Sequence, residues 1–319
     1  FEVNDLAFLD RADYKWMNAN VGRQWTTPGR GYRNAVILAG GQQQFNYDGD
    51  RTDQQAQVYY GMEFPNYWNL RTFYIYHPSV LDDRLTRGGP VVMRTGYHIG
   101  QVEVSTDPRN RAVFDLSVQG GPGIGSPTHS LTISPGVALK PASNVFISLT
   151  PSFNSDEDAA QYVTTQADPT ATSFYGDRYV FAFIKARTWS LDTRVNWTFT
   201  PNLTLQLYVQ PYFSTGAYSS FREFAAPRTL TKVVYGQDAG TIVRTPATPT
   251  SGATYTVDPD AAGPSPAFSF GDPDFAYRSL VGYAVVRWEY RPGSTIFFVL
   301  TQNRSGTNAV GNFDFLRDR

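Results

Sequence analysis

Residues 203–214, which read Leu-Thr-Leu-Gln-Leu-Tyr-Val-Gln-Pro-Tyr-Phe-Ser, decide the fold class of this chain. The odd-numbered positions carry Leu, Val, Pro or Phe, whereas the even-numbered positions carry Thr, Gln, Tyr or Ser. A period of two is typical of a β-strand that has one apolar and one polar face. Residues 189–199 repeat the alternation. Both runs reach the about 9–11 residues that a tilted strand needs to cross a bilayer.

Three segments repeat a unit in which two alternating strands flank a short turn. The turns contain Pro141, Pro201 and Pro292. Proline fixes φ and lacks an N–H, so it suits a tight turn and disrupts a central ladder. The three predicted hairpins cover residues 131–154, 191–214 and 280–304.

The connections between strands suggest a barrel with two different rims. We assign further short turns to the positions of Pro28, Pro65, Pro108 and Pro227, with a longer one around Pro169. The other connections vary in length, and the longest is residues 236–274, which has no apolar period beyond a short piece at 268–270. Short turns at one rim and long loops at the other are typical of outer-membrane barrels. Because short turns and long loops must alternate along such a chain, the assigned turns predict about sixteen strands here and about eighteen in the parent protein.

The composition excludes several classes of protein. The 319 residues carry a formal net charge of -1, which gives no electrostatic reason to expect a nucleic acid as a partner. No run of about 18 apolar residues occurs, so we expect no transmembrane helix. The absence of Cys excludes disulfides and thiolate zinc sites. The first five residues do not resemble a signal peptide, so the sequence reads as an excerpt.

Alternation alone also fits a soluble β-sandwich, but two features favour a membrane barrel. Aromatic residues gather beside the short turns, as Trp197 and Phe199 do before Pro201, where they would form an interfacial girdle. The polar faces carry charges within the strands, and these would need pairing in a dry sandwich core. The predicted fold is therefore an all-β, antiparallel transmembrane β-barrel. We expect residues 1–319 to form one barrel domain, truncated at both ends, in a bacterial outer membrane, with 236–274 as a long extracellular loop.

The predicted inner face supplies the candidate functional residues. Opposite charges across a pore tune its selectivity for polar solutes, although neighbours such as Asp192 and Arg194 would equally satisfy a polar interior by pairing. Tyrosines and glutamines on this face would stack on and hydrogen-bond a sugar, or simply pack against neighbouring strands. The candidate lumen-lining residues are Arg111, Asp115, Asp192, Arg194, Tyr208, Gln210, Tyr212, Tyr283, Arg287 and Glu289.

Other polar motifs give no support for catalysis or metal binding. The acidic clusters, such as residues 48–50 and 156–158, lack the full spacing of a calcium loop. The histidines, His77, His98 and His129, have no partner at the spacing of zinc ligands. We therefore predict no catalytic, metal-binding or cofactor-binding residue in this segment.

Several phrases of the sequence resemble a known family. They include Phe1-Glu-Val-Asn-Asp-Leu6, Arg11-Ala-Asp13 with Trp16, and the run from Val286 to Ser294, Val-Arg-Trp-Glu-Tyr-Arg-Pro-Gly-Ser. These phrases resemble the C-terminal outer-membrane barrel region of domain-of-unknown-function family 5916. In that family an N-terminal module similar to a family-9 carbohydrate-binding domain commonly precedes the barrel. That module has no counterpart here, and the resemblance supplies no catalytic residue to carry over.

Two functions follow as hypotheses. The first is a barrel with a polar lumen that has a channel, transport or anchor role for a polar solute of unknown identity. The alternative is a barrel that anchors a cell-surface carbohydrate-binding or glycan-processing protein, with residues 236–274 contributing to the external site. A hydrolase is the weakest hypothesis, because no nucleophile with a positioned base is evident. The expected partners are the lipid bilayer and a polar solute or glycan, and the oligomeric state is left open.

Overall fold

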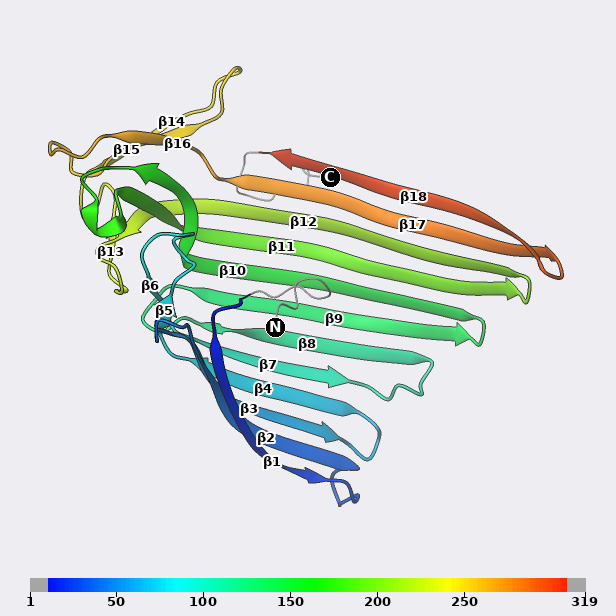
Figure 1. Cartoon of the computed structure of the whole chain (residues 1–319). Helices are drawn as coiled ribbons and strands as arrows, with labels where there is room; N and C mark the ends of the chain where they lie inside the picture. The colour runs from blue at the N-terminus through cyan, green and yellow to red at the C-terminus, as the bar shows by residue number, and fades with distance from the viewer. Residues whose placement is uncertain (1–10, 309–319) are drawn as a thin grey trace.

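The computed structural model describes residues 11–308, which form an almost entirely antiparallel β-structure (Figure 1). Within these residues the one helical element is the short 3-10 turn η1 (Thr172–Phe174). No helix in this range is both long and apolar enough to cross a membrane. The dominant element is a 13-stranded sheet, in which β13 pairs beside β12 and the other twelve strands follow chain order.

Each of these twelve strands is hydrogen-bonded to the next one, so the main sheet is a continuous meander. The three predicted hairpins are confirmed as the antiparallel pairs β9–β10, β11–β12 and β17–β18. Pro201 and Pro292 lie in the turns as predicted, whereas Pro141 lies within β9 and the turn after it is residues 143–144. The strands are β1 (Lys15–Trp25), β2 (Asn34–Phe45), β3 (Arg51–Glu63), β4 (Asn69–His77), β7 (Tyr97–Ser105), β8 (Ala112–Pro122), β9 (His129–Ala142), β10 (Val145–Ala167), β11 (Asp177–Thr200), β12 (Leu203–Phe224), β17 (Phe275–Arg291) and β18 (Ser294–Asn308), with β13 (Lys232–Val234) beside β12.

The prediction of about sixteen strands is wrong for the main sheet, because two turns lie at the other end of it. Pro169 and Pro227 follow β10 and β12 respectively, on the side of the long connections. The strands β10, β11 and β12 contain 23, 24 and 22 residues, about twice the length needed to cross a bilayer. Pro169 and Pro227 mark changes of direction, but they do not show how far the preceding strand has run. The short connections at the common end are residues 26–33, 64–68, 106–111, 143–144, 201–202 and 292–293.

The main sheet is open in the described residues. Its edges are β1 and β18, which lie at opposite sides of the sheet and do not pair with each other (Figure 1). The short turns gather at one end, on the right of the view, and the long connections gather at the other. We call these the turn end and the loop end.

The predicted long loop 236–274 contains a small sheet of its own. The three strands are β14 (Thr241–Thr245), β15 (Thr254–Asp258) and β16 (Phe268–Gly271), and the last includes the short piece expected at 268–270. Its buried residues Val257 and Phe270 pack against Val180, Ala182 and Phe221 of the long strands. β15 and β16 each alternate over only two apolar positions, and the apolar residues Ile242 and Val243 of β14 are adjacent, so the sequence shows no clear period here.

A second connection also folds back onto the main sheet. Residues 78–96 link β4 to β7 and contain the two-stranded sheet of β5 (Val80–Asp82) and β6 (Val92–Arg94). Val92 is fully buried and packs with Tyr179, Phe181 and Phe224 of β11 and β12. The loop end therefore has packed apolar clusters, while the remainder of the main sheet is a single layer.

Candidate functional site

The polar and apolar faces of the main sheet continue from strand to strand. In the register of β11 and β12, Val195 lies opposite Leu207 and Arg194 lies opposite Tyr208. Tyr208 in turn lies opposite Tyr283 of β17. Since paired residues project to the same side of a sheet, the alternation of each strand adds to that of its neighbours. The result is one mainly apolar face and one mainly polar face.

The apolar face is exposed over much of the sheet. Val102 is 50% exposed, Phe114 is 57% exposed and Phe298 is 58% exposed, although all three are large apolar residues. Soluble monomers rarely leave contiguous apolar surface of this extent uncovered. Other exposed members of this face are Val21, Ile37, Val58, Tyr74, Leu116, Trp189, Trp197, Leu280, Trp288, Ile296 and Leu300.

Four of the predicted candidate residues form one cluster on the polar face. The hydroxyl of Tyr208 donates a hydrogen bond to Oδ1 of Asp192 at 2.7 Å. The ring of Tyr208 stacks on that of Tyr283 with centroids 5.5 Å apart. The guanidinium of Arg194 lies 5.4 Å from the centre of the Tyr208 ring, a cation–π contact. Asp192 and Arg194 are thus joined through a tyrosine rather than by a direct ion pair.

Other candidates lie along the same face on either side of this cluster. Arg287 donates a hydrogen bond to Glu289 over 3.2 Å, within β17 and toward the turn end. Tyr212 lies farther toward the loop end and makes an edge contact with Tyr277, at 6.0 Å between centroids. Gln210 lies between these groups and is opposite Val281. The polar face over β11, β12 and β17 therefore presents aromatic rings, amides and charges in one array.

Arg111 and Asp115 are not part of this array. Arg111 is an exposed residue of the turn before β8, so its assignment to the middle of a strand is wrong. Asp115 lies within β8, opposite Ser105 and Gly136, and is exposed. β8 begins at Ala112, one residue after Arg111. The alternation of apolar and polar residues does not show the exact residue at which a strand begins.

The connection 78–96 makes contacts across the main sheet that the sequence did not indicate. The backbone N–H of Arg228 donates to the carbonyl of Val91, and that of Met93 donates to the carbonyl of Thr229. Arg228 also makes two hydrogen bonds to Asp50, of 3.0 and 2.7 Å. Asp50 lies between β2 and β3, whereas Arg228 follows β12. The loop end of the sheet is therefore drawn together between strands that are far apart in sheet order.

A buried polar network fixes the connections next to the long strands. Arg178 donates to Asp168 at 2.5 Å and to Glu223 at 2.6 Å, while Tyr235 donates to Glu223 at 2.8 Å. The side chain of Asp168 is only 1% exposed. Burial would raise the pKa of Asp168, but hydrogen bonds from Thr170 and Arg178 outweigh it, so the pKa lies below its usual value. This network joins the connections after β10 and β12 into one packed unit.

Comparison with known families gives one match. The sequence model of a family described as a domain of unknown function, DUF5916, matches residues 1–240. The chain belongs to this family. No curated protein and no solved structure matches it significantly. The match to DUF5916 includes the phrases at residues 1–6 and 11–16, whereas the run from Val286 to Ser294 lies beyond the matched residues.

The DUF5916 chain offers binding chemistry on its polar face. Among the described residues, no group of three or more His, Cys, Asp and Glu side chains is arranged to hold a metal ion. The charges in the array are mostly partnered by neighbours, as Asp192 and Glu289 illustrate. Such an arrangement can hydrogen-bond and stack on a polar molecule.

Proposed function

We propose that this chain forms the wall of an outer-membrane β-barrel that lets a polar solute pass along its polar face. The observation that carries the proposal is the uncovered apolar face, which suits contact with lipid. In lipid an open sheet edge is costly, because its unpaired backbone groups find no water. The proposal therefore requires the edges β1 and β18 to be paired in the membrane, with further strands or with each other.

The height of the apolar band supports a membrane position. In β10 and β11 the band runs from the pair Val145–Trp197 to the pair Phe153–Trp189. Each strand contributes about nine residues to it, which matches the requirement of a tilted membrane strand. Farther along the same side, Lys185 lies 3.5 Å from Glu157, where charges replace apolar residues.

The aromatic residues at the turn end support the same position. Trp197 stacks on Phe199 at 4.4 Å, and Trp288 contacts Tyr290 at 6.2 Å, both just before short turns. Aromatic residues prefer the boundary between lipid and water, where one end of the ring system is apolar and the other is wet. The band thus has aromatic residues at one rim and charges at the other. In this arrangement the loop-end halves of β10, β11 and β12 extend beyond the bilayer.

Recordings of the complete protein in planar bilayers test the channel proposal. We expect discrete conductance steps, because a watered polar face lets ions pass with the solute. Replacing residues 83–91 by a short Gly-Ser linker is expected to raise the conductance of each step, since this segment crosses the loop end. Failure of the protein to float with liposomes, or a complete lack of conductance steps after insertion, would contradict the proposal.

A second candidate function is a surface anchor for glycan binding. The feature that favours it is the small sheet β14–β16, which packs on the extended strands instead of forming a loose loop. A rigid projection of this kind is suited to recognition at a cell surface. Deleting residues 241–271 and measuring the retention of glycans on cells separates the two candidates. Unchanged retention would remove the small sheet from any binding role.

A further inference from the structure

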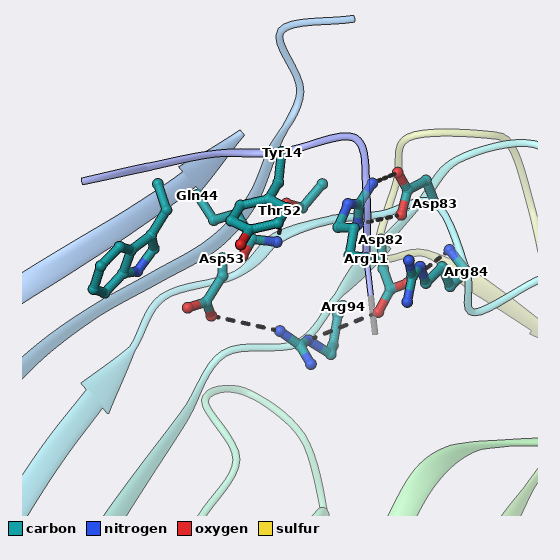
Figure 2. Close-up of a pocket in the computed structure, with 10 residues that line it drawn as sticks. Arg11, Tyr14, Gln44, Thr52, Asp53, Asp82, Asp83, Arg84 and Arg94 are labelled. Atoms are coloured by element: carbon teal, nitrogen blue, oxygen red, sulfur yellow. Dashed lines mark hydrogen bonds and ion pairs between the residues drawn. The ribbon is translucent and has the colours of Figure 1, made fainter. Parts of the chain in front are cut away.

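A pocket of about 600 Å³ lies at the loop end, beside the edge strand β1 (Figure 2). Its walls come from three separate parts of the chain: the residues around Tyr14, the facing ends of β2 and β3, and the connection 78–96. A volume of several hundred Å³ is in the range of small-molecule sites. None of the ten predicted candidate residues contributes to it.

One wall of the pocket is a closed ion pair. Arg11 donates two hydrogen bonds to Asp83, one of them 3.0 Å long, and Asn46 donates a further one to Asp83 over 3.3 Å. The hydrogen bonds from Arg11 hold the pKa of Asp83 below its usual value. Because Arg11 and Asn46 already bond to Asp83, these side chains shape the pocket. They also hold the chain before β1 against the connection 78–96.

A second group of charges in the lining is not hydrogen-bonded together, although Asp53 accepts from Gln42 and Asp82 accepts from the backbone of Leu85. Arg94 lies between Asp53 and Asp82, and its nearest nitrogen is 3.9 Å from an oxygen of each carboxylate. Figure 2 shows this group, with Arg94 reaching toward a carboxylate on either side. Both separations are too long for a hydrogen bond. Within the described residues, Arg94 therefore has attraction to two carboxylates but no hydrogen bond to either.

The two atoms of each pair are too close for another atom to lie between them, but a group beside the pair can reach both. A hydroxyl oxygen about 2.8 Å from each atom accepts from the guanidinium of Arg94 and donates to the carboxylate. A ligand carboxylate only accepts, so the neighbouring aspartate repels it, and an ammonium only donates, so Arg94 repels it. Arg94 forms two such pairs, one with Asp53 and one with Asp82, and this favours a ligand that carries at least two hydroxyl groups.

The remainder of the lining agrees with a neutral ligand that has an apolar side. Three arginines and three aspartates line the pocket, so their formal charges cancel. Tyr14 and Trp16 line the same pocket and are 41% and 52% exposed, which leaves aromatic surface for a ring to stack on. We infer that this pocket binds a neutral sugar, with ring hydroxyls bridging Arg94 to Asp53 and Asp82. The inference deepens the proposed channel function, on which it rests, by naming the class of solute received at the loop end.

Calorimetric titration of the complete protein in detergent, with maltotriose as the probe, tests the inference. We expect saturable binding of maltotriose, and no binding of glucuronate or of the zwitterion glycylglycine at the same concentrations. Arg94→Met is expected to weaken binding at least about tenfold, because it removes charge-assisted hydrogen bonds. Tyr14→Leu should weaken binding as well, by removing the stacking surface. The matched control is Arg244→Met, which removes an arginine of β14 away from the pocket and should leave binding unchanged.

The outcomes separate this inference from the channel proposal. Binding of glycylglycine or glucuronate in preference to maltotriose, or equal affinities of wild type and both pocket variants, would overturn the sugar site. Conductance steps without any binding of maltotriose would overturn it too, while leaving the channel proposal standing. Binding of maltotriose that is lost in Arg94→Met, in a protein that forms no pore, would support the sugar site and contradict the channel.

Discussion

At the scale of single residues, the two faces of the sheet give neighbouring positions opposite roles. Leu205 lies opposite Trp197 and Val286, whereas Gln206, the next residue, lies opposite Asn196. The first position belongs to the apolar face and the second to the polar face. A charge is therefore costly at one position and inexpensive at the next.

Val209→Arg is expected to impair assembly in lipid by roughly 2–4 kcal/mol, because Val209 lies opposite Thr193 in the middle of the apolar band, whereas Leu205 lies opposite Trp197 at its rim. Gln206→Arg places the same charge on the polar face and is expected to have little effect. Urea titration of each variant folded into liposomes measures the difference. Equal destabilisation by the two substitutions would mean that the faces are wrongly assigned.

The hydroxyl of Tyr208 gives a second prediction at this scale, because it partly neutralises Asp192. Tyr208→Phe removes this hydrogen bond and leaves the carboxylate free to attract cations. We expect the reversal potential in a salt gradient to shift toward cation selectivity, and Asp192→Asn to shift it the opposite way. Tyr290→Phe, next to a short turn, is the control. Identical reversal potentials in all variants would place the cluster outside the ion path.

At the scale of elements, the long strands β10, β11 and β12 depend on the network around Arg178. A guanidinium bonded to two carboxylates satisfies groups that burial would otherwise penalise. Removing one partner is costly, because Asp168 is almost fully buried. Arg178→Met is expected to destabilise the packing of β14–β16 by about 3–5 kcal/mol. Hydrogen exchange of the β15 amides measures this loss, and Arg71→Met, at an exposed arginine of β4, is the control.

The same network predicts a dependence on acid. Since the pKa of Asp168 lies below its usual value, its ion pair stabilises the fold at pH above about 4. This contribution is lost as the pH falls through the lowered pKa. Exchange in β15, corrected for the intrinsic rate at each pH, should therefore accelerate in strong acid in the wild type. Arg178→Met should lack this transition, and the same transition in both proteins would exclude Asp168 as its cause.

At the scale of the whole molecule, a single-layer sheet with two edges is stabilised by contacts at its loop end. The hydrogen bonds between Asp50 and Arg228 join connections that lie far apart in sheet order. The connection 78–96 adds the buried Val92 to the same region. These contacts hold the connections after β2, β4 and β12 against one another.

A closed barrel predicts that the complete protein resists sodium dodecyl sulfate until it is heated. We expect a compact, faster-migrating band before boiling and a slower band after it, because every strand in a closed barrel has two hydrogen-bonded neighbours. Electrophoresis of the protein refolded in detergent measures this difference. Identical migration of boiled and unboiled samples would indicate that the sheet does not close.

Much of the fold could be predicted from local patterns. The period of two in residues 203–214 determined strand β12 and the separation of its faces, because side chains alternate along any extended chain. The turns at Pro201 and Pro292 determined two hairpins, since each involves residues close together in sequence. Four residues of the polar cluster followed from the same alternation.

The tertiary structure alone decided the number of strands, the end at which Pro169 and Pro227 lie, and the folding of β14–β16 onto the long strands. It also created the pocket around Arg94, whose walls come from three distant parts of the chain. The physical reason is the distance along the chain over which each feature is decided. Alternation and turn formation depend on neighbouring residues, whereas strand length and contacts between connections depend on which distant surfaces bury one another.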